Sequence, residues 1–417
     1  MLRIFILILI FVGTEFFAFK GMRQMTVNWS VGAQRAAIVL FWLSTLVCYG
    51  LLVYMIAQRS NFALTYRSYG LFNFTVGLFF LVFVSKLLFG SLHLVNDVVG
   101  WVLGWFQTKP LIASEEYEKM NRFQFFNQLG LGVTSLYMAA SLYGFTRGKY
   151  GFRVCEETLY FDDLPEAFDG LKIVQISDMH LGSFNEALEQ VREGFDLINS
   201  LQADYVFFTG DLVNNFSDEA EPWIPFLQSI QAKRGKFSIL GNHDYGDYAL
   251  RGYPEKQQAH FARMIEIHKE SGFQLLRNES VLLQSGDQSI RLLGTENWGK
   301  GFQQYGDFDT TMRGAGQEEF KIMLSHDPTF WEEHLLGKTN VHLTLSGHTH
   351  GAQFGVEVPS LGIKFSPVSL RYKRWGGLYT EGLQHLYINR GFGFLAFPGR
   401  VGMPPEITSI TLRKKQP

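Results

Sequence analysis

The sequence has little cysteine and almost no net charge. Its 417 residues contain two cysteines, Cys48 and Cys155, which support neither a disulfide framework nor a cysteine metal site. The 37 basic and 39 acidic residues leave a formal net charge of −2. A nucleic-acid-binding domain normally carries a basic stripe, so we expect no nucleic-acid partner. The cysteine count does not reveal the compartment.

Apolar residues, by contrast, are abundant and unevenly placed. They make up 47% of the chain, including 39 Phe, and they gather in the first 150 residues. Single hydrophobic cores stop growing at roughly 250 to 300 residues, so a chain of this length is expected to form two units. We predict a transmembrane region at residues 1–150 and a soluble domain at residues 151–417.

The predicted transmembrane region contains four apolar runs. Ala36–Ala57 has no charge and is long enough to cross a hydrocarbon core of roughly 30 Å. No small-residue cleavage site follows Ile4–Phe19, which indicates a retained anchor rather than a removed signal peptide. Leu71–Phe106 is either one long tilted span or a pair of spans, and Phe126–Phe145 is the last candidate. The sequence therefore predicts a multi-pass protein of the cell (inner) membrane with four or five helices.

Three ionisable residues, Glu15, Lys86 and Asp97, interrupt these runs. Such groups are costly at membrane depth and often functional. Each lies toward an end of its run, where the side chain can reach the interface, so we expect a packed anchor rather than a proton relay. The basic loop residues divide equally between the two sides of the membrane, so they do not decide the orientation.

After Tyr160, short β-type runs alternate with helical stretches, which is typical of an α/β architecture. One helix is expected to start at Ser183, with Glu186 completing a capping box. Five of the apolar runs lead into polar loops: Leu171–Ile176, Tyr205–Thr209, Lys236–Leu240, Phe320–Ser325 and Val341–Ser346. Because ligands of open α/β sheets bind at the carboxyl ends of strands, we expect these five loops to meet at one rim.

The five loops carry Asp, Asn and His in short motifs: D-x-H at 178–180, G-D-x-x-N at 210–214, G-N-H-D at 241–244, His326, and G-H-x-H at 347–350. Carboxylate, amide oxygen and imidazole suit Mn, Fe and Zn. Two such cations roughly 3.5 to 4 Å apart can clamp a phosphoryl group and acidify a water. One carboxylate must bridge them, and Asp211 suits this task because Gly210 lets the backbone approach closely.

This order of motifs resembles the calcineurin-like metallophosphoesterase superfamily over residues 171–351. The resemblance implies an α/β fold, a four-layer β-sandwich flanked by helices, that binds two divalent metal ions (Mn, Fe or Zn) and hydrolyses phosphate esters or anhydrides. It implies that the first metal is held by Asp178, His180, Asp211 and His350. It implies that the second is held by Asp211, Asn242, His326 and His348. His243 would contact the phosphate and protonate the leaving oxygen, with Asp244 orienting it.

A further segment, Tyr387–Gly393 with Pro398, Arg400 and Pro404–Ile407, resembles the membrane-associated branch of this superfamily, the transmembrane proteins with a metallophosphoesterase domain. That branch implies hydrolysis of a phosphodiester or pyrophosphate in a lipid-linked molecule such as UDP-2,3-diacylglucosamine. A nucleotide-linked substrate would favour a cytoplasmic catalytic domain. Five basic residues are expected near the substrate's phosphates: Arg371, Lys373, Arg374, Arg390 and Arg400. Of these, Arg390 and Arg400 are the two expected to bind substrate.

Two other functions remain open at this point. The first is a broad phosphodiesterase or phosphomonoesterase that acts on soluble substrates, since the motifs do not define the pocket expected at residues 245–272 and 296–316. The second is a metal-binding membrane scaffold without turnover, although every expected ligand is present. The oligomeric state is also open. The remaining histidines match no motif and are assigned to the surface or to packing: His260, His268, His334, His342 and His385.

Overall fold

A computed structural model describes residues 2–58, 69–106, 122–184 and 188–416. The chain divides into two compact units by its internal contacts. Met1–Gln58 and Phe74–Tyr143 form one unit, here called the helical unit. Arg59–Asn73 and Gly144–Pro417 form the other, here called the α/β unit. The predicted domain limits at residue 150 remain a prediction.

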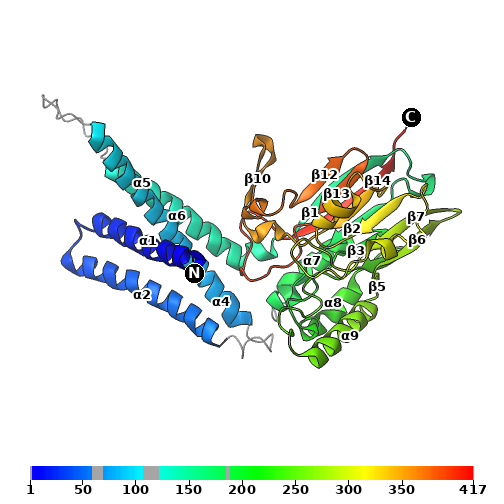
Figure 1. Ribbon diagram of the computed structural model, residues 1–417, viewed down its shortest axis with the longest axis horizontal. Coiled ribbons are helices and arrows are strands. Elements are labelled where there is room, and N and C mark those ends of the chain that lie inside the picture. Colours follow the sequence, from blue (N-terminus) through cyan, green and yellow to red (C-terminus); the bar gives the residue numbers. More distant parts are fainter. Residues whose placement is uncertain (1, 59–68, 107–121, 185–187, 417) are drawn as a thin grey trace. The chain divides into compact units, whose positions relative to one another are not determined.

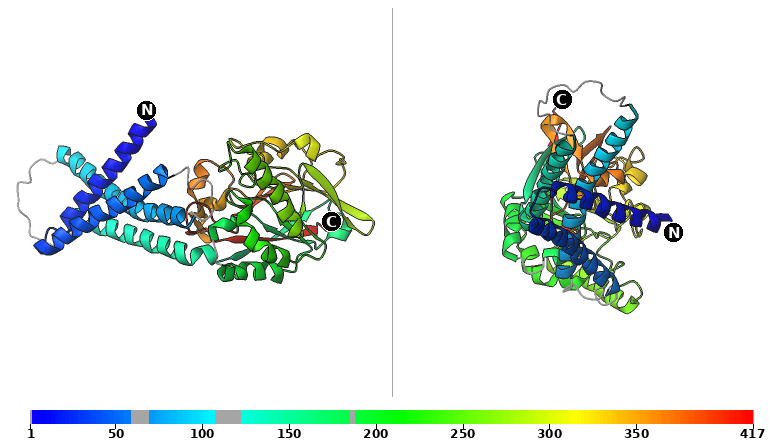
Figure 2. Two further views of the ribbon diagram at one scale, coloured as in Figure 1. Left: turned by 90° about the horizontal axis from the view of Figure 1, so that it is seen from below. Right: turned by 90° about the vertical axis from the view of Figure 1, so that its left-hand side faces the viewer.

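The helical unit consists of long apolar helices (Figures 1 and 2). Within the described residues, three segments are long and apolar enough to cross a membrane: Phe5–Met25, Val31–Ala57 and Tyr69–Trp105. The third is one continuous helical run, as the alternative of a single long span expects, and the number of spans in this region stays a prediction. The helices are α1 (Leu2–Met25), α2 (Val31–Ala57), α4 (Tyr69–Phe79), a π-helical turn (Phe80–Val84), α5 (Ser85–Phe106) and α6 (Arg122–Thr146).

Helix α6 contains the last predicted span but is not among these three segments. The predicted total of four or five spans therefore stays a prediction. Helix α2 begins at a capped end, because the Ser30 hydroxyl accepts a hydrogen bond from the Ala33 N–H.

Charged side chains inside the helical unit pair with one another. The Lys86 ammonium lies 3.1 Å from a Glu15 carboxylate oxygen, and both side chains are about nine-tenths buried. Thr45 and Tyr49 each donate a hydroxyl hydrogen bond of 3.0 Å to Glu15. The expectation that Glu15 and Lys86 reach the interface is therefore wrong, because each is neutralised by the other inside the unit. Asp97 is likewise paired, with Lys20 at 2.5 Å.

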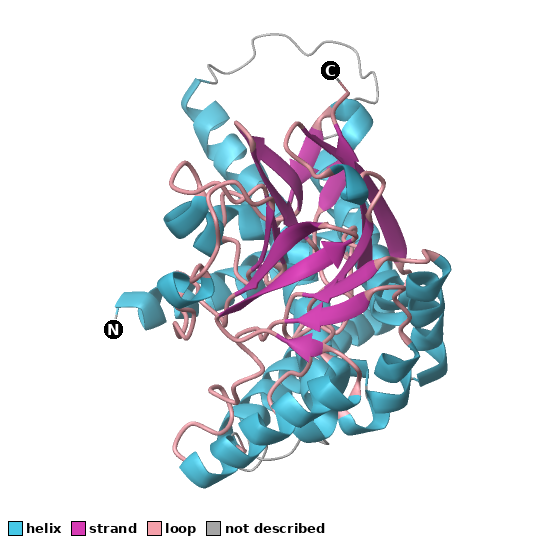
Figure 3. Cartoon of the chain, turned by 90° about the vertical axis from the view of Figure 1, so that its right-hand side faces the viewer, coloured by secondary structure: helices cyan, strands magenta, loops and turns pink. Residues whose placement is uncertain are grey.

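Two six-stranded sheets form the centre of the α/β unit (Figure 3). The first has the order β1 (Arg153–Phe161), β14 (Glu406–Lys414), β2 (Lys172–Ile176), β3 (Tyr205–Phe208), β4 (Gly235–Ser238) and β5 (Gln274–Leu275). The second has the order β12 (Gly377–Glu381), β13 (Gln384–Ile388), β9 (Leu343–Ser346), β8 (Lys321–Leu324), β7 (Gln288–Gly294) and β6 (Glu279–Ser285). A separate hairpin pairs β10 (Val356–Val358) with β11 (Ile363–Phe365).

Alternation along the strands builds four layers. In β2, Ile173 belongs to the core between the two sheets, whereas Val174 belongs to the core beneath the helices. Those helices are α7 (Leu188–Ser200), α8 (Ile224–Ser229) and α9 (Pro254–Glu270), which cover the first sheet (Figure 1). The outer face of the second sheet packs against a π-helix, Trp331–Leu335. The predicted four-layer α/β sandwich is confirmed.

The strands place the five polar loops at one rim. β2, β3 and β4 are parallel neighbours in the first sheet, and β8 and β9 are parallel neighbours in the second. The loop after β2 forms a short 3-10 helix, Leu181–Phe184, and α7 is described from Leu188 on. Ser183 lies within the 3-10 helix, so the predicted α-helix does not start at this residue. Glu186, the expected capping partner, lies outside the described residues.

Candidate metal centre

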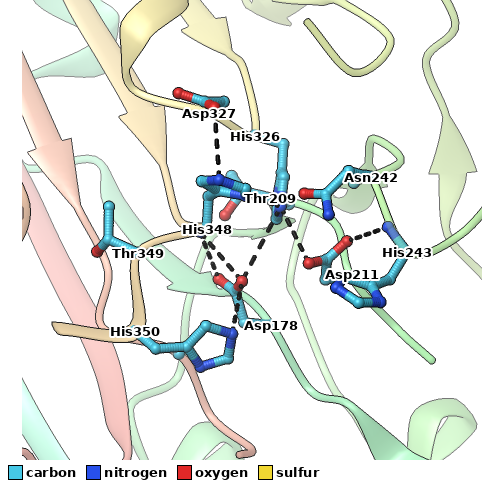
Figure 4. Close-up of polar contacts among 12 residues, drawn as sticks. Asp178, Thr209, Asp211, Asn242, His243, His326, Asp327, His348, Thr349 and His350 are labelled. Carbon is cyan, nitrogen blue, oxygen red and sulfur yellow. Dashed lines mark hydrogen bonds and ion pairs between the residues drawn. The ribbon is translucent and has the colours of Figure 1, made fainter. Parts of the chain in front are cut away.

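Two buried groups of potential metal ligands form at this rim (Figure 4). Within each group, the potential ligand atoms all lie within 4.8 Å of one another. One consists of Asp178, His180 and His350, and the other of Asp211, His326 and His348. These six residues come from four loops that are far apart in the sequence, and the fold brings them together as the motif order predicts.

Asp211 lies between the two groups. Its Oδ2 atom is 3.1 Å from Nε2 of His326 and 3.5 Å from Nε2 of His180. Glycine is required beside it, since a Cβ atom on Gly210 would lie 2.4 Å from the Gly241 nitrogen. Asp211 therefore has the position that a bridging carboxylate needs.

The spacing of the ligand atoms fits divalent cations. Nε2 of His180 and Nε2 of His350 face each other at 3.1 Å, and Nε2 of His326 lies 3.2 Å from Nδ1 of His348. Two imidazole nitrogens bound at about 2.0 to 2.1 Å to one tetrahedral ion would lie roughly 3.4 Å apart. Asn242 adds a buried side-chain oxygen that has no hydrogen-bond partner within the described chain. The donor set therefore fits two divalent ions, with the assignment of each ligand remaining a prediction.

The backbone is strained at these loops. Five of the expected ligands have positive φ angles between 44° and 72°, in the left-handed region that residues other than glycine rarely adopt: Asp178, His180, Asp211, His348 and His350. Strain of this kind costs of order 1 to 3 kcal/mol per residue and clusters at functional sites. The fold therefore holds these side chains in place at a cost to its own stability.

Neighbouring groups orient two of the imidazoles. Nδ1 of His326 lies 2.7 Å from the Thr209 carbonyl, which leaves Nε2 to face Asp211. Nε2 of His348 lies 2.8 Å from the Tyr372 hydroxyl and 3.4 Å from an Asp327 carboxylate oxygen. A second contact of this kind fixes the tautomer and orientation of a ligating histidine.

The buried carboxylates of the site are held in their ionised form and favour positive charge nearby. Burial opposes ionisation of Asp211, but the histidines around it, His326 first, hold its pKa well below its usual range. Burial also opposes the charged form of His326, yet Asp211 outweighs it and raises the pKa of His326 to about 10. Burial lowers the pKa of His348 to about 4. Burial likewise opposes ionisation of Asp178, but His350 lowers its pKa, so both buried carboxylates would stabilise added cations.

His243 lies beside this centre, but its orienting partner differs from the predicted one. Its backbone N–H donates to Oδ1 of Asp211 at 2.8 Å, and its Nδ1 lies 2.6 Å from the Asn214 carbonyl. Both carboxylate oxygens of Asp244 accept main-chain N–H groups, those of Gly241 and residues 211–213. The expectation that Asp244 orients His243 is wrong: Asp244 fixes the Asp211 loop, and Asn214 holds the imidazole.

The loop that carries Asn214 rests on Glu219, a residue that the motifs do not include. Glu219 is buried and accepts three consecutive backbone N–H groups, from residues 214, 215 and 216. Burial raises the pKa of Glu219 to about 7. No sequence signal marks this role, since the three contacts form only once the loop has folded around the side chain.

The two arginines expected to bind substrate already have partners. Arg390 pairs with Glu357 at 2.7 Å and with Glu406 at 2.6 Å. Arg400 is 2% exposed and donates to main-chain carbonyls, including that of Gly393 at 2.7 Å. These contacts favour a structural role, and substrate binding by either arginine stays a prediction.

Comparison with known proteins places the chain in a family. Residues 2–149 match the family described as probable calcineurin-like phosphoesterase, transmembrane domain, and residues 171–352 match the family described as calcineurin-like phosphoesterase. An uncharacterized metallophosphoesterase of Bacillus subtilis, YkuE, is 32% identical over 312 residues, which cover 71% of this chain and 99% of that protein. The chain belongs to the calcineurin-like phosphoesterase family, and it carries the transmembrane domain of the membrane-associated members. The predicted resemblance is confirmed.

Two more distant relatives agree with this assignment. A transmembrane protein with metallophosphoesterase domain from Danio rerio is 26% identical over 282 residues, covering 66% of this chain and 60% of that protein. The UDP-2,3-diacylglucosamine pyrophosphatase LpxG of Chlamydia trachomatis is 30% identical over 286 residues, covering 55% of this chain and 81% of that protein. The family normally binds divalent metals and acts on phosphate esters.

Proposed function

We propose that the protein is a membrane-anchored, dinuclear metal-dependent hydrolase that cleaves a phosphodiester or pyrophosphate bond in a lipid-linked substrate such as UDP-2,3-diacylglucosamine. The observation that carries this proposal is the pair of buried Asp and His groups with Asp211 between them. When bound, two divalent ions would stabilise the phosphoryl oxygens and acidify an attacking water. The substrate named in the proposal is the one that the LpxG relative is named for.

The residues of the chain supply position and proton transfer. Asp178, His180, Asp211 and His350 would hold one ion, and Asp211, Asn242, His326 and His348 the other. Because Nδ1 of His243 is committed to the Asn214 carbonyl, proton exchange with a leaving oxygen has to use Nε2. Asp244 keeps the Asp211 loop in place through its main-chain hydrogen bonds.

An exposed apolar hairpin supports a lipid-linked substrate. The β10–β11 hairpin stands out from the two sheets (Figure 1). Several of its side chains, and that of Leu370 just beyond it, are exposed. The exposed fractions are 51% for Val356, 71% for Leu361, 44% for Ile363, 55% for Phe365 and 89% for Leu370. Val356 and Phe365 are cross-strand partners. Grouped exposed apolar residues mark contact surfaces, and acyl chains are ligands that suit them. A nucleotide-linked substrate favours a catalytic unit on the cytoplasmic side of the cell membrane.

The test is phosphorus NMR of the full chain, purified in detergent and loaded with manganese. UDP-2,3-diacylglucosamine is offered beside bis(4-nitrophenyl) phosphate, a diester with a single phosphorus. Asp211→Asn serves as the inactive variant. The exposed Asp287, in the turn between β6 and β7, provides the matched control Asp287→Asn. We expect cleavage of both substrates, with the lipid nucleotide cleaved faster.

Two results would change the proposal. Cleavage of the aryl diester alone would keep a metal-dependent phosphodiesterase but remove the lipid-linked substrate. Cleavage of neither substrate by metal-loaded protein would contradict the enzymatic function and favour a metal-binding scaffold.

A further inference from the structure

A cavity of about 340 Å³ opens beside the second group of ligands. Asn242, the expected amide ligand, forms part of its wall, so the cavity adjoins the metal centre. The other walls come from the two segments that the sequence predicts to grip the rest of the substrate. They are contributed by Asp247, Tyr248, Arg251, Phe302 and Gln303.

The aromatic walls of this cavity are fixed by the centre itself. The Tyr248 ring lies 4.6 Å from the His243 ring, and its hydroxyl accepts a hydrogen bond of 2.9 Å from Nδ2 of Asn242. The Phe302 ring meets the His348 ring edge-on at 4.7 Å. A group attached to a phosphate at the metal centre would therefore lie between two rings whose positions depend on the ligands.

Two arginines at the cavity have no ion-pair partner among the residues that the structure describes. Arg251 lines the cavity, and the Arg371 guanidinium packs 4.8 Å from the centre of the Phe302 ring. A Cβ atom on Gly301, another wall residue, would lie 3.7 Å from Nη2 of Arg371. Neither arginine forms an ion pair within the described chain, whereas Arg374 pairs with Glu332 and Glu381. Both guanidinium groups are exposed and free to meet an anion.

Polar groups in the same wall suit hydroxyls. The Asp247 carboxylate is held by Tyr305 at 2.9 Å and by Gln257 at 2.8 Å, and it faces the cavity together with Gln303. A carboxylate accepts hydrogen bonds from hydroxyls, and an amide both accepts and donates them, whereas neither group suits acyl chains. The volume is near the lower limit of small-molecule sites, roughly 300 Å³, which is enough for a sugar with a phosphate.

We propose that this cavity binds the phosphosugar half of a pyrophosphate-linked substrate, with Arg251 and Arg371 on the phosphate beside the scissile one and Asp247 and Gln303 on the sugar hydroxyls. The proposal rests on the proposed function, since it assigns substrate contacts around the same centre. It places the acyl part of the substrate outside the cavity. Leu370, exposed and adjacent to Arg371 in the chain, lies where that apolar part can begin.

The experiment compares two substrates on the manganese-loaded full chain. For Arg251→Ala and Arg371→Ala, the ratio of kcat/KM for UDP-2,3-diacylglucosamine to that for bis(4-nitrophenyl) phosphate should fall roughly 10- to 100-fold, the usual range for one hydrogen bond to a charged group. The fall should come from KM, because these side chains bind the part of the substrate that does not react. Arg313→Ala, which removes an exposed arginine outside the cavity, should leave the ratio unchanged.

Product inhibition then identifies which half of the substrate occupies the cavity. UMP and glucosamine 1-phosphate are each tested as inhibitors of aryl diester hydrolysis by the unmodified chain and by Arg371→Ala. We expect inhibition by glucosamine 1-phosphate to weaken at least tenfold in the variant, and a weakening of UMP inhibition instead would overturn the placement of the acylated sugar phosphate at the cavity. An unchanged substrate ratio in the double variant Arg251→Ala/Arg371→Ala would overturn the inference, as would aryl hydrolysis without cleavage of the lipid nucleotide. Failure of the proposed function is seen in the unmodified chain, which would then leave the lipid nucleotide intact, whereas failure of this inference alone leaves the unmodified chain active on both substrates.

Discussion

The two units bury charge in opposite ways. In the helical unit, Glu15 and Lys86 neutralise each other, and both oxygens of Glu15 have further hydroxyl partners. In the α/β unit, buried carboxylates lie among imidazole nitrogens that point toward one another. In the first arrangement the buried negative charge is compensated by Lys86, whereas in the second it would be stabilised further by bound cations. Buried charge therefore indicates a functional site only when its own neighbours leave it incompletely compensated.

The largest expected effect is at the carboxylate between the two groups. Asp211→Asn keeps the shape of the side chain but removes the charge that both ions would share, so hydrolysis of bis(4-nitrophenyl) phosphate should fall by on the order of 10³-fold or more. The circular dichroism spectrum should stay that of the unmodified chain. Asp287→Asn is the matched control and should keep full activity. Full activity in Asp211→Asn would show that the buried charge of Asp211 is not needed for function. The buried charges of the two units would then no longer differ in role.

The next effect tests whether the buried charges of the helical unit, Glu15 and Lys86, stabilise it by neutralising each other. Lys86→Met leaves the Glu15 carboxylate buried without its partner, which should destabilise the helical unit by about 3 to 5 kcal/mol. Unfolding of the detergent-solubilised chain measures this change. The double variant Glu15→Leu/Lys86→Met removes both charges and should recover most of the loss. A single variant as stable as the unmodified chain would show that the ion pair contributes nothing to this unit.

A third prediction concerns a buried histidine whose Nε2 atom has no hydrogen-bond partner within the described chain. His268 is 2% exposed, and burial lowers its pKa to about 4 from an ordinary value of 6.5. Between those values the unfolded chain binds a proton that the folded chain does not, so the stability due to this group falls as the pH falls. From pH 7.5 to pH 5 this loss amounts to about 2 kcal/mol.

His268→Leu should remove that part of the acid sensitivity. The measurement is urea unfolding of the α/β unit at pH 7.5 and at pH 5 for both proteins, so that each variant serves as its own reference. Equal losses of stability in the two proteins would mean that His268 titrates normally in the folded chain.

The smallest expected effect concerns Tyr372, which contacts the expected metal ligand His348. Tyr372→Phe removes the hydroxyl beside Nε2 of His348 but leaves Asp327 at 3.4 Å. Loss of such a contact typically weakens metal binding by 10- to 100-fold, and we expect roughly tenfold here because Asp327 remains. Manganese titration followed by recovery of activity measures the change. An unaltered affinity would assign the orientation of His348 to Asp327 alone.

Much of the site follows from the sequence because its parts obey local rules. Each expected ligand comes directly after a strand, and parallel strands bring their carboxyl ends to one edge. The role of Gly210 can likewise be predicted from the sequence, because only glycine permits the close approach to Gly241. The strand-end motifs therefore predict the groups around Asp211, whereas the four-layer fold is predicted through the resemblance of these motifs to the metallophosphoesterase superfamily.

The remaining features depend on contacts between distant residues. Glu15 and Lys86 are 71 residues apart, so their positions within separate apolar runs do not reveal that they pair. The Asn214 carbonyl that holds His243 is a main-chain atom, which no motif encodes. The sequence gives no sign that Arg390 has a partner, but in the fold Glu357 and Glu406 neutralise its charge. Long-range packing, rather than local chemistry, decides these points.

The most direct test of the two-ion centre is the metal content of the full chain. Protein purified in detergent, loaded with manganese and dialysed is measured by inductively coupled plasma mass spectrometry beside Asp211→Asn. We predict two ions per chain in the unmodified protein and the loss of at least one in the variant, because Asp211 serves both groups. Fewer than two ions in the unmodified chain, or two retained in Asp211→Asn, would contradict a centre built around this carboxylate.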